Sequence, residues 1–158
     1  ITEDPTLSNG SATRPYDSEG VLTQKKDIIE NGILKTYLLD TYAARKLKSK
    51  CTGNGVLTNI LVSSKEPVSN LLKTMKDGLY ITDMMGSGAN LLTGDYSRGA
   101  FGYLVKNGEI QYPVTEITVA SNLLQMFENI ISIGDDIDKR NRIRTGSMLI
   151  DNITIGGT

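Results

Sequence analysis

The chain has 158 residues, which is enough for one domain of ordinary size with a hydrophobic core. Its formal net charge of −1 gives no overall field that would attract DNA or an anionic membrane, and no apolar run is long enough to span a bilayer. The single cysteine, Cys51, excludes an internal disulfide and favours a reducing compartment, so we expect a cytoplasmic protein. Because the chain begins at Ile1 without a methionine, we also expect it to be part of a longer protein.

Histidine is absent from the chain. Histidine is the commonest metal ligand and the usual general base near neutral pH. A zinc site of the His-Glu-x-x-x-His kind, a Ser-His-Asp site and a Cys-His site are therefore excluded, and Cys51 alone could supply only one soft zinc ligand. The sequence predicts no catalytic residue, no metal ligand and no cofactor in this chain.

The first third of the chain is predicted to hold an extended arm, a hairpin and a short helix. Proline and glycine punctuate residues 1–20, which predicts an arm and a loop. Asn31-Gly32 then predicts a tight turn between strands 27–30 and 33–39, because a type I′ turn needs positive φ at both central residues. Asp40 or Thr41 can cap a helix over 42–47, and the basic run RKLKSK that overlaps its end is interpreted as a solvated face.

The middle of the chain predicts a strand at 56–62, an amphipathic helix and a second strand at 79–85. Pro67 suits the first turn of that helix, and an apolar stripe follows at i, i+3, i+4 and i+7. Gly78 is predicted to end the helix.

A second Asn-Gly hairpin is predicted at Asn107-Gly108, between 104–106 and 109–111. The preceding segment 94–99 is polar and glycine-rich, so it is expected to lie outside a strand core. Pro113 excludes a central position in a ladder. A third helix is predicted from Ser121 through Ile130 with apolar residues on most sides, which predicts burial. Acidic residues 135–138 predict a solvated turn, and short strands are expected at 147–150 and 153–155.

These elements favour an α+β fold of mainly antiparallel hairpins wrapped on one or two buried helices. Its most site-like cluster is formed by Asp95, Tyr96, Arg98 and Gly99, which are candidates for binding a peptide or a partner. The forked guanidinium of Arg98 could clamp a carboxylate. The alternative is a structural Asp95–Arg98 pair that pins a loop over the sheet.

Six sequence blocks follow one another along nearly the whole chain, namely RPYDSEGV (14–21), ENGIL (30–34), LDTYAARKL (39–47), TGN (52–54), GDYSRGA (94–100) and NGEIQYPVTEIT (107–118). In this order they resemble the TldD/PmbA metallopeptidase family, and most closely its PmbA (TldE) branch. The resemblance implies that residues 1–158 form a β-rich, partly barrel-like C-terminal domain, preceded by an N-terminal α/β domain outside this sequence.

In this family the TldD-type subunit carries the zinc motif and the PmbA-type subunit completes the complex. The resemblance therefore implies a non-catalytic subunit of a cytoplasmic zinc metallopeptidase that degrades or matures peptides. Zinc is expected only in the TldD-type partner, and the other expected partners are unfolded peptides, with self-association left open. Whether this chain should itself be counted as an enzyme is left open.

Two rival functions come from other classes. One is a modulator that acts on nucleic acid or DNA gyrase, but the net charge and the lack of an aromatic, basic face make nucleic acid a poor partner. The other is a small-molecule binding domain centred on 95–99. Neither rival needs a membrane.

Overall fold

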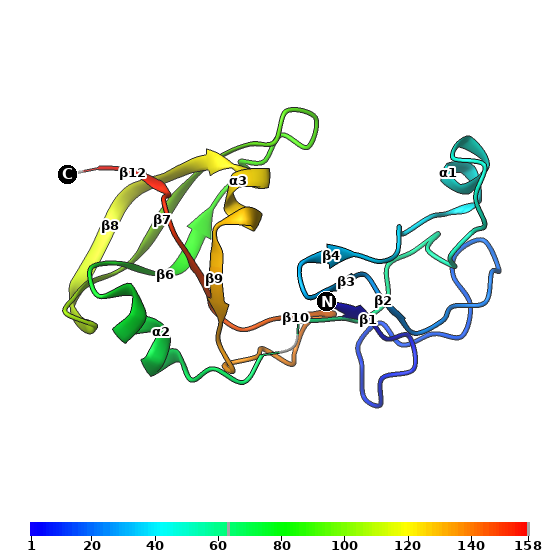
Figure 1. Ribbon diagram of the computed structural model, residues 1–158, viewed down its shortest axis with the longest axis horizontal. Coiled ribbons are helices and arrows are strands. Elements are labelled where there is room, and N and C mark those ends of the chain that lie inside the picture. Colours follow the sequence, from blue (N-terminus) through cyan, green and yellow to red (C-terminus); the bar gives the residue numbers. More distant parts are fainter. Residues whose placement is uncertain (63, 158) are drawn as a thin grey trace. The chain divides into compact units, whose positions relative to one another are not determined.

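The computed structural model describes residues 1–62 and 64–157, and the chain folds into two compact units (Figure 1). Unit 1 comprises Ile1–Ser64 and Ile137–Gly146, and unit 2 comprises Lys65–Asp136 and Ser147–Thr158. Each unit is therefore built from two stretches of chain that are distant in sequence. No helix in the described part of the chain is long and apolar enough to cross a membrane.

Unit 1 contains a small four-stranded sheet with the strand order β10-β5-β1-β2. Its strands are β1 (Thr2–Glu3), β2 (Lys26–Asp27), β5 (Ile60–Leu61) and β10 (Ile143–Arg144). β1 pairs antiparallel with both β2 and β5, whereas β10 runs parallel to β5. The expectation of an extended arm at 1–20 is therefore incomplete, because its first residues form a central strand.

The first Asn-Gly turn is confirmed. It joins β3 (Ile29–Glu30) to β4 (Ile33–Leu34), with φ of 50° at Asn31 and 78° at Gly32. The returning strand is shorter than the predicted 33–39. Helix α1 (Thr41–Lys46) follows, and the Asp40 carboxylate caps it by accepting a 2.6 Å hydrogen bond from the backbone N–H of Ala43.

Unit 2 is built on an antiparallel sheet with the strand order β12-β8-β7-β6. Its strands are β6 (Gly78–Met85), β7 (Asp95–Lys106), β8 (Glu109–Asn122) and β12 (Thr154–Gly156). The second Asn-Gly turn is confirmed as well, with φ of 53° at Asn107 and 78° at Gly108. The core of the unit is a cluster of Ala100, Ile117 and Val119.

Residues 95–99 lie within β7, so the expectation that this polar segment falls outside a strand is wrong. Strands on both sides supply ladder partners, and glycine makes room for them. A side chain at Gly102, further along β7, would collide with the backbone of Tyr80. Pro113 is tolerated in β8 because β12 pairs only with residues 118–120, which leaves Pro113 on an edge.

Helix α2 (Val68–Met75) has the predicted apolar stripe, with Leu71 buried. It ends at Lys76, which has a φ of 60°, and not at Gly78, which opens β6. The backbone N–H of Gly108 bonds to the carbonyl of Lys76 at 2.8 Å, so the β7–β8 turn is docked on the end of α2.

Helix α3 (Leu123–Glu128) is shorter than predicted and has no buried residue. Residues after it form β9 (Ile130–Ile133), which pairs antiparallel with β11 (Met148–Ile150). The prediction of a helix buried on most sides is therefore wrong, because part of its apolar run belongs to a strand. The α+β class with mainly antiparallel strands is confirmed, and the described strands do not close into a barrel.

Candidate functional site

Unit 2 contains an open groove of about 910 Å³ that is bordered by α2, β6, β9 and β11. Most of its lining is apolar, including Leu71, Leu72, Met75, Leu79, Ile81 and Val119. Arg98 is the one cationic residue in the described lining. Apolar walls with a few polar groups are typical of ligand grooves, so this is the most site-like feature of unit 2.

Arg98 lies on β7 and reaches across to the last residues of β6. Its guanidinium donates hydrogen bonds to the carbonyls of Met84, at 2.9 Å, and Met85, at 3.3 Å. A guanidinium has five N–H donors, and among the described residues these two bonds are the only ones that it forms. The remaining donors can serve a ligand carboxylate or carbonyl at the side of the groove.

The structure separates the four residues that the sequence grouped together. Tyr96 and Arg98 share one face of β7, and the Tyr96 hydroxyl lies 2.8 Å from the sulfur of Met84. Asp95 and Gly99 belong to the other face by strand alternation. The Asp95 carboxylate is exposed and accepts a 2.7 Å hydrogen bond from the Thr93 hydroxyl. The alternative of an Asp95–Arg98 ion pair is therefore wrong for the described structure.

In unit 1, Asp17, Glu19 and Cys51 bring three potential metal-ligand atoms within 4.8 Å of one another. Both carboxylates already brace loops, however. Asp17 accepts hydrogen bonds from the backbone N–H groups of Glu19, Val21 and Gly55. Glu19 accepts two from Thr41. Carboxylates engaged in this way, with one thiol and no histidine, do not fit a zinc peptidase centre.

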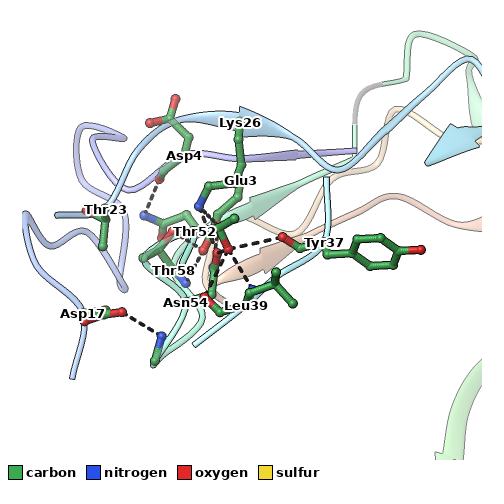
Figure 2. Close-up of polar contacts among 12 residues, drawn as sticks. Glu3, Asp4, Asp17, Thr23, Lys26, Tyr37, Leu39, Thr52, Asn54 and Thr58 are labelled. Atoms are coloured by element: carbon green, nitrogen blue, oxygen red, sulfur yellow. Dashed lines mark hydrogen bonds and ion pairs between the residues drawn. The ribbon is translucent and has the colours of Figure 1, made fainter. Parts of the chain in front are cut away.

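A buried polar network lies beside this cluster, and the sequence gave little sign of it (Figure 2). Glu3 is fully buried on β1, and its carboxylate accepts hydrogen bonds from Lys26, Asn54 and Thr58. The Lys26 ammonium lies 2.7 Å from the Glu3 carboxylate and 3.1 Å from the Asn54 side-chain oxygen. Among the described residues, no buried side-chain nitrogen or oxygen lacks a partner, so the network braces the unit and leaves no group aimed at a ligand.

The Glu3 carboxyl is held in its charged form. Burial alone would raise its pKa, but the hydrogen bonds from Lys26, Asn54 and Thr58 outweigh burial and lower the pKa below 4.5. These partners are 23 to 55 residues away in sequence, so no local pattern marks Glu3. The one signal was the Thr52-Gly53-Asn54 block, because Asn54 bonds to Glu3 and lies 2.8 Å from the Thr52 hydroxyl.

The sequence profile of the PmbA/TldA metallopeptidase C-terminal domain matches residues 1–157. The chain belongs to this family. It is 49% identical to a PmbA metalloprotease homologue of Haemophilus influenzae and 48% identical to the PmbA metalloprotease of Escherichia coli O157:H7. Each alignment covers 99% of this chain but only 36% and 35% of the relative, so the chain spans about a third of the length of these relatives.

Solved structures agree with this assignment. A crystal structure from Thermotoga maritima, named as a candidate modulator of DNA gyrase, superposes with a TM-score of 0.88 at 34% identity. The match covers 98% of this chain and 38% of that one. TldE from Thermococcus kodakarensis superposes with a TM-score of 0.78 over 99% of this chain and 39% of its own, and at 19% identity this likeness shows the fold alone. A TldD metalloprotease homologue of Buchnera aphidicola is 30% identical over the whole of this chain and 38% of its own.

Proposed function

We propose that this chain is the C-terminal domain of a non-catalytic PmbA/TldE-type subunit in a zinc metallopeptidase complex that degrades or matures peptides. The observation that carries the proposal is the family match over residues 1–157 in a chain without histidine. The zinc and the catalytic groups would then belong to a TldD-type subunit. Nothing in the described structure requires a cofactor in this domain, and the complex would act in the cytoplasm.

The proposed role of unit 2 is to hold an extended peptide at the groove. β6 is the end strand of its sheet, and it borders the groove along most of its length. An edge strand can bind an extended peptide through main-chain hydrogen bonds, while neighbouring apolar pockets accept alternate side chains. Arg98 would add a charged contact at the end of β6 where it meets Met84 and Met85.

A TldD-type subunit is the proposed partner. The Buchnera relative named TldD aligns with the whole of this chain, so a domain of the same family occurs in proteins of both names. Two related domains can pair about an approximate twofold axis and form one composite groove. This supports the pairing without requiring a catalytic residue in the present chain.

The test is to co-express the full-length protein that contains this domain with a TldD-type subunit, purify the pair through a tag on one member, and assay cleavage of an unfolded peptide. The pair is expected to co-purify and to cleave, and the tagged chain alone is expected to be inactive. Cleavage by this protein alone, or failure of the pair to associate, would contradict the proposal. Salt-dependent binding to a DNA duplex without peptide cleavage would favour the gyrase-associated rival instead.

A further inference from the structure

The loop between β6 and β7 presents two adjacent leucines to solvent. Leu91 has an exposed fraction of 85% and Leu92 one of 98%, which are the largest among the exposed apolar side chains. Helix α3 adds Leu124 and Phe127 at the same end of the unit 2 sheet (Figure 1). We name this set of four residues the leucine surface.

The leucine loop is held by a dense set of hydrogen bonds. The Asn90 side chain accepts bonds from the backbone N–H groups of Leu92 and Thr93. The Asn122 amide donates to the carbonyl of Thr93 at 3.0 Å, and the N–H of Leu123 bonds to the carbonyl of Gly94 at 2.7 Å. The loop is therefore tied to the start of α3, so the exposure of its leucines is a built feature of the fold. Clustered apolar side chains that are exposed in this way typically mark an interaction surface.

The charges around the leucine surface are acidic. Asp83, Asp95 and Glu128 are exposed near it, and its one nearby cation, Arg98, is directed to backbone carbonyls. Unit 2 as a whole has five Lys and Arg residues against ten Asp and Glu residues. A loop that inserts into a membrane is normally surrounded by Lys and Arg, so these charges favour a protein partner with a basic rim.

Unit 1 carries a surface of the complementary kind. It has twelve Lys and Arg residues against eight Asp and Glu residues. Around α1, Tyr42 and Leu47 are exposed between the exposed cations Arg45, Lys46, Lys48 and Lys50. The Lys46 ammonium lies 5.5 Å from the centre of the Tyr42 ring, and among the described residues none of the four cations forms an ion pair. We name these six residues the α1 surface.

We propose that the leucine surface of one copy of this chain docks on the α1 surface of a second copy. Apolar side chains would meet at the centre, and the acidic rim of one surface would face the basic rim of the other. In a twofold dimer each copy offers both surfaces, so the same contact is made twice and the assembly closes. This proposal does not depend on the proposed pairing with a TldD-type subunit.

The apolar part of the contact is tested by measuring the mass of the 158-residue chain by light scattering at concentrations up to roughly 100 µM, where a micromolar dimer is well populated. The wild type is expected at twice 17.2 kDa, and Leu91→Ser/Leu92→Ser is expected to raise the dimer Kd at least about tenfold. Ile110→Ser/Tyr112→Ser is the matched control, because these exposed residues lie toward the β7–β8 turn at the opposite end of the same sheet. A monomeric wild type, or equal weakening by both variants, would overturn the proposal.

The charged part is tested by reversing each rim. Lys46→Glu/Lys48→Glu and Asp83→Lys/Glu128→Lys are each expected to be monomeric, since both contacts of a twofold dimer become repulsive. An equimolar mixture of the two variants is expected to dimerise, because each contact then joins opposite charges again, and added salt should weaken it. A mixture that stays monomeric would overturn the proposal, as would leucine-dependent sedimentation of the wild type with phosphatidylserine vesicles without dimerisation.

Discussion

At the scale of single residues, Glu3 shows how a buried charge becomes a structural requirement. Its carboxylate is fully buried and is matched by the Lys26 ammonium at 2.7 Å, with further bonds from Asn54 and Thr58. A buried ion pair adds little net stability over an apolar pair, but removing one partner leaves the other charge unpaired. The network therefore fixes the pairing of β1 with its neighbours at the cost of tolerance to substitution.

We expect Glu3→Gln to destabilise the protein by about 3–5 kcal/mol, because the buried Lys26 ammonium loses its counter-ion. The matched control is Glu30→Gln, which removes an exposed ion pair with Lys35 at 3.3 Å and should cost less than about 1 kcal/mol. Urea unfolding of both variants measures the two values. Equal effects of the two substitutions would show that the Glu3 network carries no special role.

The same substitution has a pH dependence. The folded-state pKa of Glu3 lies below its usual value of 4.5, so its ionised form contributes stability above that value. The contribution is lost as pH falls through the folded-state pKa. The stability difference between the wild type and Glu3→Gln should therefore be constant near neutral pH and shrink below about pH 4.5. A difference that stays constant down to pH 3 would contradict the assignment.

Arg98 is the residue at which structure and function can be separated. Its two bonds go to the carbonyls of Met84 and Met85, and Arg98 is half-buried. Water can replace a donor there, so we expect Arg98→Ala to cost no more than about 1 kcal/mol of folding stability. If Arg98 serves the proposed groove, the same substitution should lower peptide cleavage by the assembled complex about tenfold or more.

Melting curves and cleavage rates, measured side by side, check this prediction. Arg98→Lys retains the charge without the fork and should fall between the alanine variant and the wild type. Lys106→Ala, which removes an exposed cation elsewhere on β7, is the control for loss of charge. A large drop in melting temperature together with full cleavage would assign Arg98 a purely structural role.

At the scale of elements, the two Asn-Gly hairpins offer an internal comparison. Both turns have positive φ at both central residues, so valine at either glycine is strained. A Cβ atom at Gly32 would meet nothing within 4 Å, whereas one at Gly108 would lie 3.0 Å from the Cα of Lys73 on α2. The second turn therefore carries a packing constraint that the first does not.

We expect Gly32→Val to destabilise the protein by about 1 kcal/mol and Gly108→Val by about 2–3 kcal/mol, because the second substitution also displaces α2. Urea unfolding midpoints, with unchanged slopes, measure both. An effect at Gly32 as large as that at Gly108 would show that backbone strain alone decides the cost.

Local patterns predicted the elements that depend on local chemistry. Both Asn-Gly turns, the Asp40 cap and the apolar stripe of α2 follow from sequence, because each needs only residues close to it. The failures lie where distant partners decide. Residues 130–133 continue a helical stripe but pair with β11, and polar residues 95–99 form a strand because β6 and β8 lie on both sides.

The candidate site was predictable only in part for the same reason. Arg98 was singled out from its charge and flanking glycines, and the structure places it at the groove. Its contacts with Met84 and Met85 depend on how β6 pairs with β7, which no spacing within the sequence encodes. The Glu3 network depends on contacts across as many as 55 residues, and it was not foreseen.

At the scale of the whole molecule, the division of charge between the units is hidden by the net value. A formal charge of −1 combines an excess of four positive charges in unit 1 with an excess of five negative charges in unit 2. Arguments from net charge alone therefore describe this chain poorly. The excess charges lie on separate units, which allows each unit to select a partner of opposite sign.

The last prediction concerns metal content. The chain alone should hold well below one zinc ion per molecule after dialysis and should cleave no peptide, because it has no histidine and a single thiol. The one described group of candidate ligands, formed by Asp17, Glu19 and Cys51, has its carboxylates engaged by backbone and hydroxyl donors. Elemental analysis of the wild type and of Cys51→Ala provides the check, and both should give the same low value. One zinc ion per chain that resists dialysis and disappears in Cys51→Ala would instead establish this group as a metal site.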